Sequence, residues 1–157
     1  MDELQRLVDE AAIVQLTYQY SRGIDLLDRA LYKSCFTDPV EIDFESWDGT
    51  QGPMPADGWV DYVWDLVVGL DATQHIMTNH NIDFDDDDHA TCIAYLHAQH
   101  YIAGAPVETF TAGGFYTNSV VRTDGGWRIG RCKLTLTWRT GDVGILELGK
   151  KRPPRSS

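Results

Sequence analysis

The sequence predicts an α+β fold in which N-terminal helices pack on a strongly curved, mostly antiparallel sheet. Apolar residues recur at helical spacing up to about position 70, and beyond it the pattern changes to long strand-like runs. Short turn signals separate these runs, so consecutive strands are expected to pair with one another. A curved sheet wrapped around helices leaves a cone-shaped cavity, which the N-terminal helix closes at one end.

Three helices are expected in the first half of the chain. The first begins at a cap, Asp2, and runs to about Ser21. Gly23 is expected to end it, because glycine readily adopts the left-handed conformation at a helix C-terminus. A short second helix should cover 28–36, starting at an aspartate cap, and a third should cover about 56–70 with an apolar stripe along one side.

One strand is expected before the third helix and four after it. The expected ranges are 40–44, 73–85, 90–103, 107–122 and 127–137. Residues 48–53 have the composition of a turn, and the Asp-Gly pair at 124–125 is a strong hairpin signal. The four aspartates at 85–88 lack the spaced alternation and distal glutamate of an EF-hand, so they predict a solvated turn rather than a calcium site.

Length and composition fit one globular domain. The chain has 157 residues, 43% apolar and 24% charged. We expect the domain to span 1–149 and a basic, solvated tail to occupy 150–157. The formal net charge of −11 argues against nucleic acid as a partner, because a phosphate backbone would be repelled by most of this surface.

The cysteines and the N-terminus indicate the expected compartment. Cys35, Cys92 and Cys132 are odd in number and widely spaced. They predict buried thiols in a reducing compartment rather than a disulfide framework or a zinc site. A charged amphipathic helix, not a signal peptide, is expected at the start, and no apolar run reaches membrane-spanning length. The expectation is therefore a cytoplasmic protein with no membrane partner.

Four of the five histidines lie on two adjoining expected strands. His75 and His80 are on the first, and His97 and His100 are on the second. Side chains alternate between the faces of a strand, so each pair should be split between opposite faces unless a bulge intervenes. Three histidines near an aspartate could form a metal site, but this alternation disperses them, and no metal is expected.

Asp25, just past the expected end of the first helix, and His75 form a candidate general base. Neutral His75 could remove a proton from a carbon beside a carbonyl or leaving group, while the carboxylate holds the ring and stabilises the imidazolium. No cofactor is required. A second group must activate the substrate, and the candidate neutral donors are Tyr20, His100, Tyr116 and Asn118. His100 could equally protonate a departing hydroxyl, and the tyrosines could instead only line the cavity.

Several short motifs occur in an order shared with a known family. They are Gly-Ile-Asp at 23–25, Thr-Gln-His at 73–75, Gly-Phe-Tyr-Thr-Asn at 114–118 and Asp-Gly-Gly-Trp at 124–127. With the expected helices and strands around them, they resemble the SnoaL-like branch of the nuclear-transport-factor-2-like superfamily, from about Leu7 to Trp138. Within it, the chain resembles scytalone dehydratase and hexachlorocyclohexane dehydrochlorinase.

The resemblance implies roles for particular residues. Asp25 falls at the catalytic aspartate of these enzymes, His75 at the general base, and His100 at a second active-site histidine of the dehydratase. The implied substrate-binding set is Tyr20, Ile24, Phe44, Met77, Tyr116, Asn118 and Arg131.

The chain also departs from both enzymes. Ile24 and Phe44 stand where the dehydratase has two tyrosines that hold a water against the substrate carbonyl. Tyr20 and Cys132 stand where the dehydrochlorinase has a catalytic lysine and arginine, although neighbouring Arg131 could replace the arginine. The Asp–His pair is thus kept, while the residues that would activate the substrate differ from those of both enzymes. This leaves the identity of the substrate open.

The expected function is a cofactor-independent lyase of the dehydratase type, or a related isomerase, for a small hydrophobic cyclic hydroxy-carbonyl compound. The alternatives are a non-catalytic small-molecule-binding or assembly domain and, ranked last, a dioxygenase small subunit. A homo-oligomer is also expected, because Tyr95, Tyr101 and Trp138 would form a costly exposed apolar face. The resemblance favours a trimer, with a dimer as the alternative.

Overall fold

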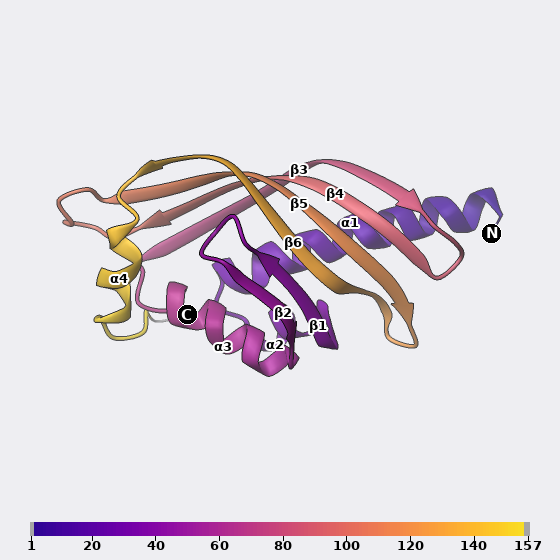
Figure 1. Ribbon diagram of the computed structural model, residues 1–157, viewed down its shortest axis with the longest axis horizontal. Coiled ribbons are helices and arrows are strands. Elements are labelled where there is room, and N and C mark those ends of the chain that lie inside the picture. The colour runs from indigo at the N-terminus through magenta and orange to yellow at the C-terminus, as the bar shows by residue number, and fades with distance from the viewer. Residues whose placement is uncertain (1, 156–157) are drawn as a thin grey trace.

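The computed structural model describes residues 2–155, which form four α-helices and one six-stranded sheet (Figure 1). The helices are α1 (Glu3–Asp25), α2 (Arg29–Lys33), α3 (Ala56–Val67) and α4 (Gly144–Lys150). The strands are β1 (Phe36–Phe44), β2 (Thr50–Met54), β3 (Ala72–Phe84), β4 (His89–Tyr101), β5 (Thr109–Thr123) and β6 (Gly126–Gly141). The predicted α+β class is confirmed.

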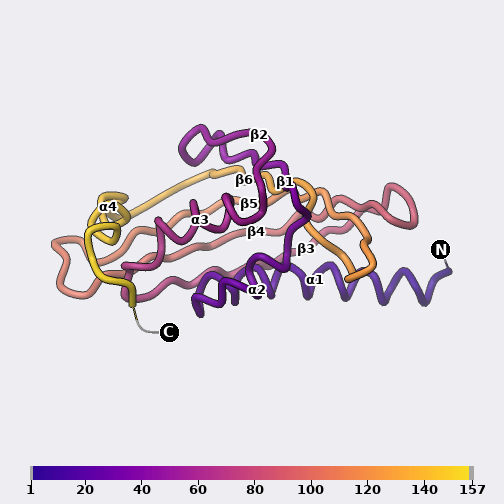
Figure 2. Tube along the Cα trace, turned by 90° about the horizontal axis from the view of Figure 1, so that it is seen from below, coloured from indigo at the N-terminus to yellow at the C-terminus, as the bar shows by residue number. Residues whose placement is uncertain are grey.

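The sheet has the order β2-β1-β6-β5-β4-β3, and its neighbouring strands are antiparallel except for the parallel pair β1 and β6. It curls over the helices, with α1 running beneath β3 and with α2 and α3 on the same concave side (Figures 1 and 2). Ile13 of α1, Trp59 of α3 and Ile129 of β6 are fully buried between these layers. The concave side of the sheet therefore holds the core.

Gly23 was predicted to end the first helix, but it lies inside that helix. A β-carbon at this position would stand 2.7 Å from the Tyr32 Cα, so glycine lets α1 approach α2 closely. The helix continues to Asp25, and Leu27 takes the left-handed conformation at φ 54°. The short second helix begins at its predicted cap, because the Asp28 side chain accepts a hydrogen bond from the Leu31 amide at 2.9 Å.

Two further elements differ from the sequence prediction. Residues 50–54, expected mostly as a turn, form β2, which pairs with β1 at the edge of the sheet. An edge position tolerates Pro53, since one side of the strand needs no ladder hydrogen bonds. A fourth helix, α4, which was not predicted, ends at Lys150 where the solvated tail was expected to begin, and Arg152 and Arg155 of that tail contact the domain.

A bulge in β3 brings two histidines to the same face. The pairing of β3 with β4 shifts between residues 78 and 81, and Asn79 has a positive φ of 54°. Buried and exposed positions therefore change parity, and both His75 and His80 face α1. The His80 Nε2 lies 2.7 Å from the Thr17 Oγ1, which makes it a satisfied structural residue, as predicted.

A buried carboxylate, Asp9, attaches the N-terminal half of α1 to the sheet. Asp9 is 2% exposed and accepts hydrogen bonds from Arg122 at 2.6 and 2.9 Å and from the Trp127 Nε1 at 3.0 Å. These contacts, Arg122 first, hold the pKa of Asp9 down at about 2. The ion pair fixes α1 along the sheet and so helps to define where its C-terminal end, Asp25, lies.

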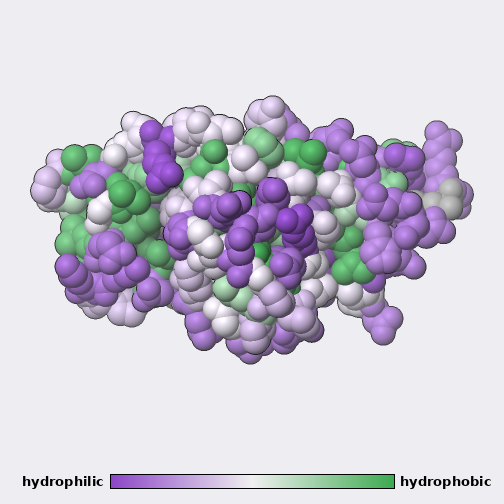
Figure 3. Space-filling model, viewed as in Figure 1, coloured by the Kyte–Doolittle hydropathy of each residue, from purple (hydrophilic) through white to green (hydrophobic). Residues whose placement is uncertain are grey.

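The visible surface is mostly polar, and the cysteine thiols are buried. The face in Figure 3 is largely hydrophilic, with hydrophobic side chains gathered near α4, where Val143 and Leu148 are exposed. The three cysteines are free and buried, as predicted. Among residues 2–155, no helix combines the length and the apolar character that a membrane crossing requires.

Candidate active site

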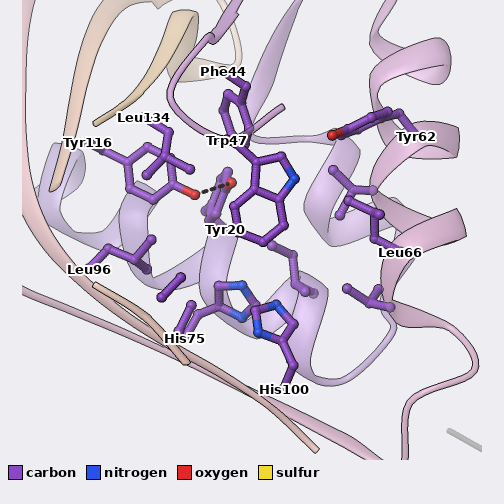
Figure 4. Close-up of a pocket in the computed structure, with 15 residues that line it drawn as sticks. Tyr20, Phe44, Trp47, Tyr62, Leu66, His75, Leu96, His100, Tyr116 and Leu134 are labelled. Carbon is purple, nitrogen blue, oxygen red and sulfur yellow. Dashed lines mark hydrogen bonds between the residues drawn. The ribbon is translucent and has the colours of Figure 1, made fainter. Parts of the chain in front are cut away.

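A cavity of about 50 Å³ lies between α1, α3 and the concave face of the sheet (Figure 4). Most of its lining is apolar, with Ile24, Phe44 and Leu134 among the contributors. Polar groups reach it from α1 (Tyr20), β3 (His75), β4 (His100) and β5 (Tyr116), and two further aromatic residues, Trp47 and Tyr62, complete the lining. A few hydrogen-bonding groups in an apolar cavity are typical of a small-molecule site.

The predicted Asp25–His75 pair is formed. The His75 Nδ1 lies 2.7 Å from the Asp25 Oδ1, and the His75 backbone amide donates to Oδ2 at 2.8 Å. Thr73, on the same face of β3, donates its hydroxyl to Oδ1 at 3.0 Å. The carboxylate only accepts, so the imidazole carries its proton on Nδ1 and keeps a free lone pair on Nε2. A histidine in this tautomer is prepared to act as a base.

His100 is the second imidazole in the cavity. It faces inward whereas His97 contacts Trp138 on the outer face, so the two histidines lie on opposite faces, as alternation predicts. The rings of His75 and His100 lie 5.8 Å apart, nearly perpendicular. The His100 Nδ1 lies 3.2 Å from the Phe110 carbonyl oxygen, which can only accept, so Nδ1 holds the proton and Nε2 is unprotonated.

Burial, with a smaller effect of nearby His75, lowers the pKa of His100 to about 4. His100 is therefore neutral near pH 7 and has no proton on Nε2 to give to a departing group. Its geometry fits a hydrogen-bond acceptor for a substrate hydroxyl better than the general acid considered from the sequence.

This buried histidine predicts a pH dependence of stability. Below pH ~6.5 the unfolded chain binds a proton at His100 that the folded protein does not bind until about pH 4. Stability therefore falls as the pH drops through this window, by about 3 kcal/mol in total from this residue. We expect His100→Gln to lose correspondingly less stability than wild type between pH 6.5 and 4, measured by urea unfolding. Equal losses in the two proteins would contradict a neutral buried imidazole.

Tyr20 and Tyr116 form a hydroxyl pair in the cavity. Their phenol oxygens lie 2.9 Å apart, and both side chains are almost completely buried (Figure 4). Burial raises the pKa of each well above its ordinary value, so both hydroxyls stay protonated. One hydroxyl donates to the other, which leaves a single O–H proton that can be offered to a ligand.

The family model of the SnoaL-like domain matches residues 5–133 of this sequence. The chain belongs to the SnoaL-like family. A solved structure of the Kfla4162 protein from Kribbella flavida is 32% identical, covers 90% of this chain and 97% of its own, and superposes with a TM-score of 0.80. Membership of the SnoaL-like family thus confirms the predicted resemblance.

Two other solved structures share the fold of this SnoaL-like domain at lower identity. One, described as a scytalone dehydratase from Novosphingobium aromaticivorans, is 22% identical, covers 87% of this chain and 89% of its own, with a TM-score of 0.77. The other is the hexachlorocyclohexane dehydrochlorinase LinA-type3 from Novosphingobium barchaimii, 23% identical, covering 92% and 97%, with a TM-score of 0.73. Comparison with curated proteins gave no match.

Three residues of the predicted substrate-binding set do not line the cavity of this SnoaL-like domain. Met77 is buried in the core on the same face of β3 as His75. Asn118 is 1% exposed beyond Tyr116 on β5, and its Oδ1 has no hydrogen-bond partner among the described residues. Arg131 is half exposed and pairs with Asp43 at 2.7 Å. It therefore does not replace the catalytic arginine for which Cys132 stands in this sequence. Tyr20, Ile24, Phe44 and Tyr116 do line the cavity.

Thr73 and Trp47 are among the contributors to the SnoaL-like site that the sequence did not predict. Thr73 lies two residues before His75, and strand alternation could have placed it on the same face, beside Asp25. Trp47 lies in the connection between β1 and β2 and lines the cavity 6.3 Å from the His100 ring, and no pattern in the sequence indicates this. Among residues 2–155, no three His, Cys, Asp or Glu side chains are grouped as a metal would need.

Proposed function

We propose that this protein is a cofactor-independent lyase of the dehydratase type, or a closely related isomerase, acting on a small hydrophobic cyclic hydroxy-carbonyl compound. The observation that carries the proposal is the 2.7 Å contact between Asp25 and His75, which leaves the unprotonated Nε2 of an oriented imidazole in a largely apolar cavity. Such a group suits proton abstraction from carbon.

The proposed reaction begins at a C–H bond beside the substrate carbonyl. The His75 Nε2 takes the proton, and the electron pair of the C–H bond moves to the carbonyl oxygen to give an enolate. Asp25 stabilises the imidazolium through Nδ1, and the free hydroxyl of the Tyr20–Tyr116 pair donates to the enolate oxygen. In a dehydration the enolate re-forms the carbonyl, the hydroxyl on the next carbon leaves, and the imidazolium proton goes with it as water.

The same steps account for the related isomerisation. If the substrate carries a C=C bond beside the reacting carbon in place of the leaving group, proton abstraction gives a dienolate, and the imidazolium returns its proton to the far carbon of that dienolate. The second imidazole, His100, would hold the substrate hydroxyl by accepting its proton in a hydrogen bond. The apolar lining favours an uncharged, compact ligand, because a charged group would lose its hydration without gaining an opposite charge.

The named relatives support an elimination. A dehydratase and a dehydrochlorinase both remove a small molecule from their substrates, and both share this fold. A non-catalytic binding domain is the rival, and the close Asp25–His75 contact favours the enzyme over it. For the assembly, we propose a homo-oligomer, with a trimer favoured, in which the exposed Ile76, Tyr95 and Trp138 of the outer sheet face are covered.

The test is turnover of a panel of cyclic β-hydroxy ketones, followed by the ultraviolet absorbance of the conjugated ketone that dehydration produces. Hydrogen–deuterium exchange at the carbon beside the carbonyl, followed by NMR in D₂O, detects proton abstraction even without elimination. We expect His75→Ala to lower both rates ~100- to 10,000-fold. His89→Ala is the matched control, since His89 lies at the exposed start of β4 beside Asp86, away from both the cavity and the outer-face residues named above. Equal rates for wild type and His75→Ala would overturn the proposal.

A further inference from the structure

The segment that follows α4 returns across the domain to the end of α1. The Arg152 guanidinium pairs with Asp71 at 2.7 Å and donates to the Gly69 carbonyl at 3.1 Å. Three residues later, the Arg155 backbone amide donates to the Val68 carbonyl at 2.8 Å. The segment is thereby attached to the connection between α3 and β3, directly beside the Asp25–His75 pair.

The Arg155 side chain contacts the residues that hold the Asp25–His75 pair, called the dyad below. Its Nη2 donates to the Asp25 carbonyl oxygen at 2.8 Å and lies 3.5 Å from both the Ile24 carbonyl oxygen and the Thr73 Oγ1. Thr73 in turn donates to the Asp25 carboxylate. One partly buried guanidinium thus contacts the backbone of Asp25 and one of the side chains that orient its carboxylate.

The two members of the dyad are held with unequal firmness. His75 sits within β3, whose pairing with β4 holds the strand in place, while the His75 amide points to the open edge and donates to Asp25. Asp25 is the last residue of α1, and the last carbonyls of a helix have no partner within the helix and fray easily. A cation at these carbonyls satisfies them and is favoured by the helix dipole. Arg155 supplies that cation from the opposite end of the chain.

We propose that Arg155 is a positioning residue that fixes Asp25 against His75, so that the C-terminal segment completes the active site. The inference rests on the proposed function for its kinetic consequence, but not for its structural one. Arg155 does not line the cavity and acts only through Asp25 and Thr73. Its loss should therefore affect the rate of proton transfer and leave the binding of the substrate nearly unchanged.

The experiment compares Arg155→Ala and Arg155→Lys with wild type. Lys151→Ala is the matched control, since it removes a nearby positive charge that is exposed and does not contact the dyad. We expect Arg155→Ala to lower kcat roughly 10- to 100-fold with KM within about twofold, because small misplacements of a catalytic group are costly. Lysine should restore part of the loss, since it keeps the charge but not the planar group.

A second readout needs no substrate. In ¹⁵N-labelled protein, the proton shared by the His75 Nδ1 and Asp25 is observed by NMR. We expect this resonance to broaden and exchange faster in Arg155→Ala, and to match wild type in Lys151→Ala. If the resonance in Arg155→Ala is unchanged, the positioning role is overturned. A global loss of dispersion in Arg155→Ala would overturn it as well, by making Arg155 a residue of general stability.

The two proposals fail separately. If Arg155→Ala keeps both the resonance and kcat while His75→Ala abolishes turnover, the positioning role is wrong and the proposed function stands. If wild type turns over none of the panel but the resonance is lost in Arg155→Ala, the positioning role stands and the proposed function fails.

Discussion

Asp25→Asn is expected to lower turnover ~1,000-fold or more while leaving the domain folded. In wild type, both carboxylate oxygens accept hydrogen bonds, from the His75 ring, the His75 amide and Thr73. Asparagine has nearly the same shape, but its NH₂ group would face one of these donors. The imidazole would then turn or take the other tautomer, with a proton on Nε2, and the base would be lost; in serine proteases the equivalent change costs about 10⁴-fold.

The measurement is kcat together with the ¹⁵N shifts of the His75 ring, which report the tautomer directly. Asp28→Asn, three residues away, is a suitable control, because asparagine caps a helix about as well as aspartate does. Turnover within a few-fold of wild type in Asp25→Asn, with the tautomer unchanged, would show that the carboxylate does not orient the base.

The Tyr20–Tyr116 pair should respond unequally to its two single substitutions. Only the hydroxyl that accepts within the pair keeps a proton for the substrate, so its replacement by phenylalanine should lower kcat roughly 100-fold. Replacing the other tyrosine, which donates within the pair, leaves that proton in place and should cost much less. The double variant Tyr20→Phe/Tyr116→Phe should be no more impaired than the worse single variant, because the two hydroxyls deliver one proton.

Steady-state kinetics of the three variants identify which tyrosine faces the developing enolate. Tyr18→Phe, on an exposed part of α1, is the matched control. Additive losses in the double variant would mean that each hydroxyl contacts the substrate independently. An unchanged kcat in all three variants would exclude the pair as the hydrogen-bond donor to the enolate oxygen. The measurement thus distinguishes a shared proton from two separate donors.

Much of the fold was predictable because local pattern and global structure agree. Alternating strands and the apolar stripes of α1 and α3 gave the α+β class, and the histidine parity on β4 held. The errors have distinct causes. Gly23 was read as a helix end, but its lack of a side chain is needed for contact with Tyr32. On β3, parity failed at the bulge around Asn79, which depends on pairing with the next strand and has no signature in the sequence.

The site was predictable only in part. Asp25, His75 and His100 were predictable because chemistry and family motifs indicate the same positions. His75 and His100 line the cavity, and Asp25 contacts His75 from behind. Arg131 was chosen as a neighbour of a family position, but the adjacent residue on a strand faces the opposite side. The role of Arg155 could not be predicted, because its contact joins residues 130 positions apart in the sequence and no local pattern indicates it.

The parallel pairing of β1 with β6 has a consequence for how the protein is made. Ile42 lies beside Cys132, so the first strand of the sheet waits for the last one to be synthesised. Before β6 is present, β1 has only β2 as its native partner, and contacts between distant parts of a chain, such as β1 with β6, slow folding. One edge of β1 therefore lacks its native partner while the intervening strands are synthesised, and an open strand edge can pair with another chain.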